Sequence, residues 1–336
     1  MEEKLILGTV QFGLDYGITN KNGKLNEDEI DKIFNFCDIH NILYFDTAQD
    51  YGISENILSK YSNLYPKFNI ITKSKFKNKN IDDTIKISLD KFDKIECYML
   101  HSYDDYKNTE LLNKLLSYKN MNKINKIGVS IYNVKEGIEI LNDNIVDIIQ
   151  LPFNYFDNQW FSEDFQNLIK KTNIKIHVRS IFLQGILLNK PIKYPNNIQQ
   201  NEFDKLEDQI LTISKKLQLT KLELCFAYIN SFEWINKFLI GIDNLEHLEL
   251  NFNIINKNLK LTKEDIIFIQ SISQDINQDI INPSKWIFNS GPPDLLEPCV
   301  INDTLSTSGD SYKSDTCDAA DRKPEDTSLR LHEHSF

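Results

Sequence analysis

The stretch that decides the fold spans residues 95–151 and reads IECYMLHSYDDYKNTELLNKLLSYKNMNKINKIGVSIYNVKEGIEILNDNIVDIIQL. It holds three short apolar runs, separated by two longer segments whose apolar residues recur every three or four positions. In chain order these are residues 95–100, 109–119, 126–130, 134–142 and 146–151. Continuous apolar runs that alternate with amphipathic segments are typical of parallel strands covered by helices. The stretch therefore predicts repeated strand–helix units.

The same alternation continues in both directions, from the N-terminus to about residue 286. Five further strands are expected at residues 5–9, 42–46, 69–72, 174–180 and 237–242. Five further helices are expected at residues 27–40, 54–65, 82–91, 162–171 and 201–216. Asn26 is the expected N-cap of the first of them. Because eight such units match a closed barrel better than an open sheet, we predict an α/β fold, a (β/α)8 TIM barrel over residues 1–286.

Residues 287–336 differ in composition from the rest of the chain. They are rich in Ser, Asp, Thr and Pro, and their ten acidic and four basic residues contribute −6 of the formal net charge of −11. Such a segment cannot bury enough apolar surface to offset the entropy lost when it is ordered. We expect a disordered acidic tail, either a regulatory appendage or foreign sequence joined to a complete domain.

Composition excludes several classes of protein. The chain has 336 residues, of which 41% are hydrophobic, enough for a large core without disulfides or metals. Its net charge of −11 argues against a nucleic-acid partner, because phosphate binding needs clustered Lys and Arg. No apolar run reaches the roughly 20 residues that span a bilayer, and the N-terminus lacks a signal-peptide pattern. The five cysteines have no CxxC spacing, which indicates reduced thiols and a cytoplasmic protein.

Four polar side chains follow the expected second, third and fourth strands. Asp46 ends the second strand and Tyr51 lies in the loop after it, while Lys73 and His101 end the third and fourth strands. In a barrel, such strand ends converge on one mouth. Taken singly, each residue has a plainer interpretation as a loop cap, a packed aromatic, a surface lysine or a structural histidine. Their joint placement in barrel order favours a catalytic role.

This set of side chains suits the reduction of a carbonyl group. The carbonyl oxygen gains negative charge as hydride reaches its carbon, so it needs a proton donor. A free tyrosine, with a pKa of about 10, donates weakly, and we expect the Lys73 ammonium to lower the pKa of Tyr51. Asp46 is expected to hold Lys73, and His101 to orient the carbonyl oxygen. No GxGxxG motif follows a strand, and no metal, haem or pyridoxal phosphate site is indicated.

The sequence resembles the aldo-keto reductases over about residues 4–286. The shared motifs, in order, are Leu7-Gly8-Thr9, Gln11-Phe12-Gly13, Phe45-Asp46-Thr47-Ala48, Tyr51-Gly52, Ile71-Thr72-Lys73, Leu100-His101, Ile127-Gly128-Val129-Ser130, Gln150-Leu151-Pro152-Phe153-Asn154 and Ile240-Gly241. The resemblance implies a TIM barrel with a nicotinamide cofactor, NADP(H) or NAD(H), at its mouth. The family's catalytic tetrad falls on Asp46, Tyr51, Lys73 and His101. Its nicotinamide contacts fall on Thr9, Ser130 and Gln150, and the buried amide of Gln150 is expected to pair with the cofactor.

The chain departs from the family pattern near the cofactor. The residue after Ser130 is Ile131, where members of the family usually have Asn. Asn133 lies nearby, but it is equally consistent with the N-cap of a helix. In the stretch Val178-Arg179-Ser180, Arg179 takes the place of an aromatic residue that stacks on the nicotinamide. A guanidinium plane can also stack, so Arg179 and Ser180 stay cofactor candidates.

The phosphate end of the cofactor is also unusual. At the two positions that usually grip the 2′-phosphate of NADPH, this chain has Gly241 and His247, while Asn251 keeps the asparagine of the adenine end. Arg179 is the only arginine before residue 287. A 2′-phosphate prefers a bidentate donor, so strong NADPH preference is not expected and NADH use stays open.

Three functions remain open at this point. The first is reduction of a small-molecule aldehyde or ketone to an alcohol, with Tyr51 as general acid. A sugar-derived substrate is suggested because residues 8–17 resemble bacterial members associated with sugar or polysaccharide metabolism. The second is a nicotinamide-binding regulatory or sensor barrel with little turnover, and the third is a non-redox isomerase. The sequence gives neither the substrate nor the oligomeric state. The loop 189–200, which contains two prolines, is expected to cross the barrel mouth.

Overall fold

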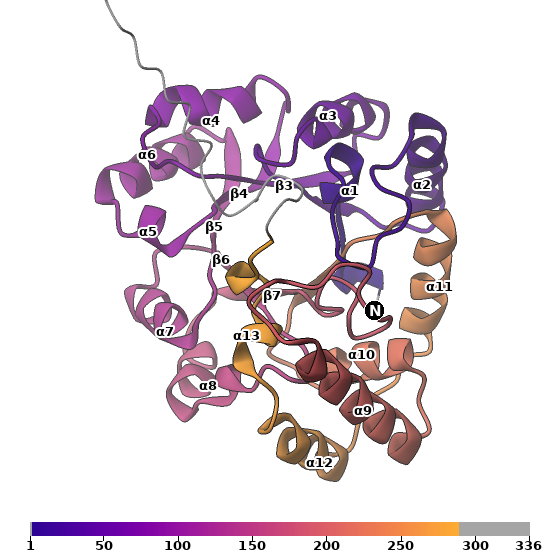
Figure 1. The fold of residues 1–336 in the computed structure, drawn as a ribbon. Coiled ribbons are helices and arrows are strands. Elements are labelled where there is room, and N and C mark those ends of the chain that lie inside the picture. The colour runs from indigo at the N-terminus through magenta and orange to yellow at the C-terminus, as the bar shows by residue number, and fades with distance from the viewer. Residues whose placement is uncertain (1, 289–336) are drawn as a thin grey trace, which may run out of the picture. The chain divides into compact units, whose positions relative to one another are not determined.

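The computed structural model describes residues 2–288, which form a closed barrel of parallel strands (Figure 1). The strands are β1 (Leu5–Gly8), β2 (Tyr44–Asp46), β3 (Asn69–Ser74), β4 (Ile95–Leu100), β5 (Ile124–Ser130), β6 (Ile148–Pro152), β7 (Lys175–Arg179) and β8 (Lys237–Ile240). Each strand pairs with the next one in sequence, and β1 also pairs with β8, which closes the sheet. The predicted (β/α)8 barrel is therefore confirmed, and each strand lies within two residues of its predicted bounds.

Helices surround the strands (Figure 1). The longer ones are α2 (Glu27–Ile39), α3 (Ser54–Leu64), α4 (Ile81–Leu89), α6 (Thr109–Asn120), α7 (Val134–Asp143), α8 (Glu163–Ile169), α9 (Gln200–Leu217), α10 (Lys221–Asn230), α11 (Leu245–Asn256) and α12 (Lys263–Ser273). Shorter segments are η1 (Glu2–Lys4), α1 (Val10–Gly13), α5 (Tyr103–Tyr106), η2 (Gln159–Phe161), α13 (Gln278–Ile281) and η3 (Pro283–Lys285). All seven predicted helices are present. The helices α10, α11 and α12 were not predicted from the sequence. The residues of α10 from Leu224 to Asn230 are all buried, so that helix lacks an amphipathic pattern.

The first long helix begins where the sequence predicts it. The Asn26 side chain accepts a hydrogen bond from the Glu29 backbone nitrogen at 2.9 Å, which satisfies one of the free amides of the first turn. Three acidic residues follow at the start of α2, where the positive end of the helix dipole stabilises them. The expected N-cap is confirmed.

Apolar side chains fill both the space under the helices and the inside of the barrel. Between helices and strands, the ring of Phe34 stacks on that of Tyr61, with 4.0 Å between centroids. Inside the barrel, a second cluster contains Ile71 and Met99. A Cβ atom on Gly128 would come within 2.8 Å of the Met99 side chain, so glycine is needed for this interior to close. The filled interior leaves the ends of the strands as the place for a ligand site.

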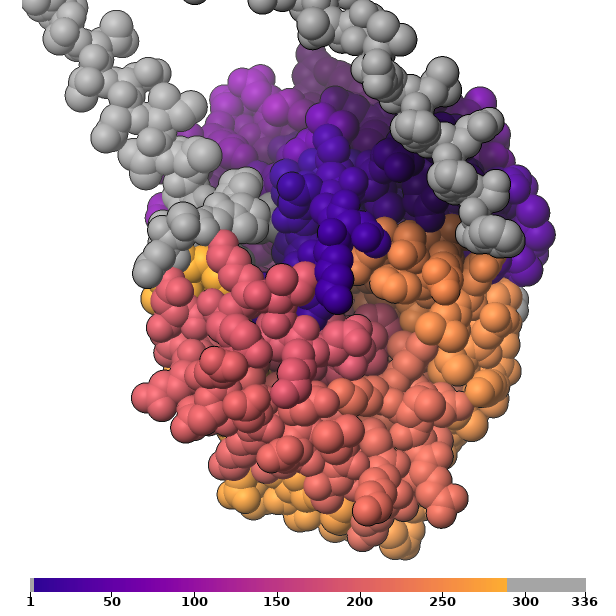
Figure 2. Space-filling model, turned by 45° about the vertical axis from the view of Figure 1, so that its right-hand side comes forward, coloured from indigo at the N-terminus to yellow at the C-terminus, as the bar shows by residue number. Residues whose placement is uncertain are grey.

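Loops from distant parts of the chain meet over the C-terminal ends of the strands. The Ile192 backbone nitrogen donates to the Ile18 carbonyl oxygen at 2.8 Å, and Asn196 donates in the same way to Ile287 at 2.7 Å. On the face shown in Figure 2, the indigo surface near the N-terminus accordingly borders the pink surface of the segment before α9. The loop 189–200 thus contacts both other loops, in keeping with its expected place at the mouth.

Some sequence predictions fall outside the part of the chain that the structure describes. The predicted tail lies there apart from Ile287 and Phe288, as do Cys299 and Cys317. The other three cysteines are free and buried. Within residues 2–288, no helix is both long and apolar enough to cross a bilayer. In the same residues, no three His, Cys, Asp or Glu side chains are grouped to hold a metal ion.

Candidate active site

The structure brings the four predicted catalytic side chains together at the ends of β2, β3 and β4. The Lys73 ammonium donates to the Asp46 carboxylate and, at 3.0 Å, to the Thr47 carbonyl oxygen. Its Nζ atom lies 5.3 Å from the centre of the Tyr51 ring. The His101 ring meets the Tyr51 ring edge-on, with 6.2 Å between centroids. Three strand ends and one loop thus place these groups around one space.

The Asp46–Lys73 pair is held by further contacts. Both residues are only 2% exposed, and such a buried ion pair is stable only if its remaining hydrogen-bonding capacity is satisfied. The second carboxylate oxygen of Asp46 accepts from Gln150 Nε2 at 2.8 Å. Thr9 Oγ1 donates to the Asp46 carbonyl oxygen at 3.0 Å. The buried amide of Gln150, expected to pair with a cofactor, therefore has Asp46 as its partner through Nε2.

The pKa of Tyr51 moves in the direction opposite to the one expected. Burial raises this pKa well above its ordinary value of 10, the nearby Asp46 and Tyr16 raise it further, and the Arg179 charge opposes them. The expected lowering by Lys73 is therefore wrong for the protein as it stands in this structure. Desolvation is the largest contribution to this pKa, and the Lys73 ammonium is itself paired with Asp46. At neutral pH the phenol carries its proton, as a proton donor must.

His101 is neutral. Burial lowers its pKa well below the ordinary 6.5, and the positive charges of Lys73, Lys75 and Arg179 lower it further. Its backbone nitrogen donates to the Ser74 carbonyl oxygen at 3.0 Å, which fixes the residue directly after β4. A neutral imidazole carries one N–H, so it can donate a single hydrogen bond to an oxygen in the site. Burial also lowers the pKa of Lys73, and the Asp46 carboxylate opposes that change.

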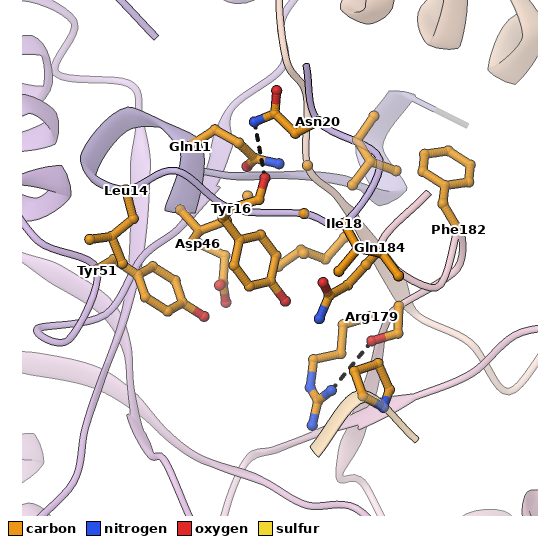
Figure 3. A pocket seen from close by; sticks show the side chains of 18 of the residues that line it. Gln11, Leu14, Tyr16, Ile18, Asn20, Asp46, Tyr51, Arg179, Phe182 and Gln184 are labelled. Carbon is orange, nitrogen blue, oxygen red and sulfur yellow. Dashed lines mark hydrogen bonds between the residues drawn. The ribbon is translucent and has the colours of Figure 1, made fainter. Parts of the chain in front are cut away.

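These residues line a cavity of about 550 Å³, within the size range of ligand pockets. In Figure 3 the hydroxyl ends of Tyr16 and Tyr51 and the guanidinium of Arg179 point into the same space. The lining includes all four tetrad candidates, Asp46, Tyr51, Lys73 and His101. It also includes the predicted cofactor residues Thr9, Ser130, Gln150, Arg179, Ser180 and Gly241. Most of the predicted site thus shares one cavity.

His247 and Asn251 do not line this cavity. Both lie on α11, after the end of β8. The His247 side chain is 50% exposed, and its Nδ1 atom lies 3.8 Å from the Asp243 carboxylate. The Asn251 side chain is buried. Their predicted contacts with the adenine end of a cofactor stay predictions.

Arg179 is fixed by a ring and a carbonyl group. Its guanidinium lies 4.3 Å from the centre of the Tyr132 ring. One nitrogen donates to the Ile131 carbonyl oxygen at 3.2 Å, and another reaches Ser180 Oγ at 3.4 Å. Asn133 caps α7 in a capping box, so its side chain serves the helix and does not replace the asparagine that Ile131 lacks.

The sequence did not assign several residues that shape the cavity. Tyr16 lines it, and burial raises the pKa of its phenol to about 12. Tyr132 and Trp286 also line it, the latter with its indole nitrogen bonded to the Asp279 and Ile280 carbonyl oxygens. Tyr16 belongs to residues 8–17, which the sequence analysis related to the substrate class without giving this side chain a role. Nothing local to Trp286 could have shown that it returns to the mouth.

Comparison with known families decides the class of this protein. The model of the aldo/keto reductase family matches residues 4–274. The chain belongs to the aldo/keto reductase family. The resemblance seen in the sequence is thereby confirmed. An aldo/keto reductase is an oxidoreductase, so membership supports carbonyl reduction in general, a small-molecule carbonyl substrate and a nicotinamide cofactor.

Solved structures agree with this aldo/keto reductase fold. A glycerol dehydrogenase, AKR11B4 from Gluconobacter oxydans, has a TM-score of 0.62 and 18% identity, over 86% of this chain and 94% of its own. PA4992 from Pseudomonas aeruginosa, described as a "putative aldo-keto reductase", has a TM-score of 0.56 and 19% identity, over 76% of this chain and 91% of its own. No curated protein sequence matches the chain significantly. At these identities the likeness extends to the fold alone.

The cavity of this aldo/keto reductase suits a nicotinamide cofactor. Two residues of its lining, Gln11 and His101, each hold a buried polar atom without a hydrogen-bond partner among residues 2–288, namely Gln11 Oε1 and His101 Nδ1. Buried polar groups normally find a partner, so these atoms favour a polar ligand here. The Ser130 hydroxyl and the Arg179 guanidinium can donate hydrogen bonds to a carboxamide oxygen.

Proposed function

We propose that this aldo/keto reductase reduces an aldehyde or ketone to an alcohol with NADPH or NADH, and that Tyr51 is its general acid. One observation carries the proposal. The Lys73 ammonium, bonded to Asp46, lies 5.3 Å from the centre of the Tyr51 ring, and the centre of the His101 ring lies 6.2 Å from it. A sugar-derived carbonyl compound is the substrate that residues 8–17 favour, because that stretch resembles family members associated with sugar metabolism.

Each side chain has a distinct task in this reaction. The nicotinamide cofactor, when bound, supplies the hydride that reaches the carbonyl carbon. Tyr51 gives its phenolic proton to the carbonyl oxygen, so that C=O becomes CH–OH. Lys73 stabilises the phenolate left behind, and Asp46 keeps Lys73 in place. His101, being neutral, donates one hydrogen bond that orients the oxygen toward Tyr51.

The cofactor is proposed to bind along the same cavity. Thr9, Ser130, Gln150 and the pair Arg179 and Ser180 are the residues proposed for its nicotinamide end. Gly241, His247 and Asn251 are those proposed for its adenosine end. Since residues 2–288 hold no arginine besides Arg179, use of NADH as well as NADPH is expected.

Replacement of Tyr51 by Phe tests the proposal. We expect the Tyr51→Phe variant to fold and to bind the cofactor, but to lose carbonyl reduction by at least about 100-fold, because the proposed general acid is gone. The matched control is Tyr155→Phe, which removes a buried hydroxyl that has no hydrogen-bond partner among residues 2–288 and lies outside the cavity lining. Unchanged turnover by Tyr51→Phe on an accepted carbonyl compound would rule out the role of Tyr51.

The raised pKa of Tyr51 favours a second candidate, a nicotinamide-binding sensor with little turnover. A phenol whose pKa lies well above 10 gives up its proton reluctantly, so catalysis can be slow. Cofactor titration by fluorescence, followed by a panel of aldehydes and ketones, separates the two functions. Tight cofactor binding without reduction of any carbonyl compound supports the sensor.

A further inference from the structure

Arg179 stands apart from the other cations of this protein. It is the only arginine in residues 2–288, although the same residues hold many lysines. It ends β7 and lines the cavity. Its plane is fixed against the Tyr132 ring and by the bond to the Ile131 carbonyl oxygen. An arginine held in this way loses little further entropy when its remaining N–H groups bind a ligand.

The charge of Arg179 has no counter-ion in the part of the chain that the structure describes. No carboxylate of residues 2–288 lies within ion-pair distance of its guanidinium, whereas Lys73 in the same lining is bonded to Asp46. The charge of Arg179 acts to lower the pKa of Asp157. The carboxylate oxygens of Asp157, however, accept hydrogen bonds from the Gln159 amide and the Trp160 indole. A guanidinium does not lose its proton at physiological pH. The free-energy cost of partly burying its unpaired charge is therefore offset only when an anion binds.

The unpaired charge lies close to the reacting groups. The positive charge of Arg179 acts on the titration of Tyr16, Tyr51, Lys73 and His101 alike. Figure 3 shows Arg179 and Tyr51 facing the same space. An anion held by Arg179 therefore lies in the same cavity as the proposed proton donor Tyr51.

We infer that Arg179 anchors a carboxylate of the substrate, so that the preferred substrates are carbonyl compounds that also carry a carboxylate group. This inference rests on the proposed reductase function and narrows its substrate class. It is compatible with stacking of Arg179 on the cofactor, because a guanidinium stacks through its face and donates through its edge.

The charges in the cavity lining favour a monoanion with a planar head. Asp46 and Lys73 neutralise each other, and the opposite charges of Asp15 and Lys193 balance in the same lining, which leaves the positive charge of Arg179. One carboxylate balances the remaining charge of Arg179. Its two coplanar oxygens match the parallel N–H groups of a guanidinium edge. A phosphate dianion would leave an excess negative charge beside Asp46.

Matched pairs of substrates test the inference at saturating cofactor. The first pair is succinic semialdehyde and butanal, and the second is 2-carboxybenzaldehyde and benzaldehyde. We expect the wild-type protein to favour the acid of at least one pair by roughly 10- to 100-fold in kcat/KM, as for a hydrogen bond between charged groups. Arg179→Met should remove this preference, and Arg179→Lys should keep part of it. Because each ratio is taken within one variant, an effect on cofactor binding cancels.

The control replaces a cation of the barrel that is paired and lies outside the cavity lining. Lys126 on β5 forms an ion pair with Glu96 at 2.6 Å. Lys126→Met removes one positive charge, as Arg179→Met does, and should keep the acid-to-neutral ratio of the wild type. A ratio that stays the same in Arg179→Met overturns the carboxylate anchor, and so does a preference for glyceraldehyde 3-phosphate over both acids.

A binding measurement separates failure of the anchor from failure of the reductase. Benzoate and benzamide, titrated by calorimetry into the cofactor-saturated protein, report on the anchor without turnover. We expect benzoate to bind more tightly than benzamide in the wild type and in Tyr51→Phe, and the difference to vanish in Arg179→Met. Benzoate that binds no better than benzamide overturns the anchor even if butanal is reduced. Arg179-dependent benzoate binding with no carbonyl reduction keeps the anchor and rejects the reductase.

Discussion

The two sides of the barrel mouth differ in whether their buried charged groups are paired. On the side of β2 and β3, each buried ionic group is paired within the protein. Asp46 holds Lys73, and behind them the Glu55 carboxylate, 1% exposed, accepts from Thr72 and Ser88 at 2.7 Å. These groups are fixed before any ligand arrives, which is the preorganisation that catalysis requires.

On the side of β7, two buried or half-buried basic groups have no carboxylate partner among residues 2–288. They are Arg179 at the mouth and His177 two residues earlier on the same strand. An unpaired group responds to what binds beside it or to pH. We therefore expect chemistry to depend on the β2–β3 side and recognition to depend on the β7 side.

The largest expected effect comes from breaking the Asp46–Lys73 pair. Lys73→Met leaves a buried carboxylate without its cation, which should lower the free energy of unfolding by about 3–5 kcal/mol. Carbonyl reduction should fall by at least about 100-fold, because the phenolate of Tyr51 loses its stabilising charge. Urea unfolding and steady-state kinetics measure the two effects.

A double variant separates the two consequences. Lys73→Met combined with Asp46→Leu removes both charges and should recover much of the lost stability, because an apolar pair can replace a buried ion pair. It should remain inactive. If activity returned together with stability, the pair would be structural, and the contrast between the two sides of the mouth would be wrong.

Local patterns in the sequence were enough to predict the barrel and to place the four tetrad candidates at one end of it. Each strand is a continuous apolar run, and Asp46, Lys73 and His101 stand at or next to strand ends, so barrel topology alone makes them converge. The pKa of Tyr51 could not be predicted in this way. Tyr16, which comes from a different loop and lines the same cavity, adds to the rise of this pKa.

Partners distant in sequence explain the other differences. Gln150 and Asp46 are separated by 104 positions, and no local pattern indicates that an amide on β6 donates to a carboxylate on β2. The lack of an ion-pair partner for Arg179 is likewise a property of the whole cavity lining. The sequence could identify the residues, but only their assembly shows which of them are already bonded to one another.

An intermediate effect is expected at Glu55, a buried carboxylate that does not line the cavity. Glu55→Ala takes away the acceptor of two buried hydroxyl groups and of the Lys91 ammonium at 2.9 Å. The free energy of unfolding should fall by about 2–4 kcal/mol, since buried donors lose their partners. Unlike Lys73→Met, this variant should still reduce carbonyl compounds at temperatures where it is folded.

The control for this prediction is Glu96→Ala. Glu96 pairs with Lys126 at 2.6 Å, but that lysine is 44% exposed, so the loss should stay within about 1 kcal/mol. Chemical denaturation of the three proteins compares them directly. Loss of carbonyl reduction in well-folded Glu55→Ala would mean that the catalytic part of the β2–β3 side extends beyond the cavity.

The smallest expected effect is that of His177 on stability. It tests whether a basic side chain of β7 without a carboxylate partner always marks a ligand-binding site. Burial lowers the pKa of His177 to about 3, and the charges of Lys237 and Lys126 add to the effect. Because this folded-state pKa lies below the unfolded value of 6.5, the unfolded chain binds the proton first. The stability that His177 contributes is therefore complete above pH 6.5 and is lost as the pH falls.

Comparison with His177→Leu isolates this contribution from those of the carboxylates. Between pH 7.5 and 5.5, the wild type should lose about 1.4 kcal/mol of unfolding free energy relative to the variant, as measured by urea unfolding at each pH. A constant difference between the two proteins would show that His177 is not buried as a neutral group. The expected result means that a histidine can remain unpaired simply by staying neutral. Arg179 on the same strand has no such option, because a guanidinium keeps its charge at every physiological pH, and for that reason it needs an anion.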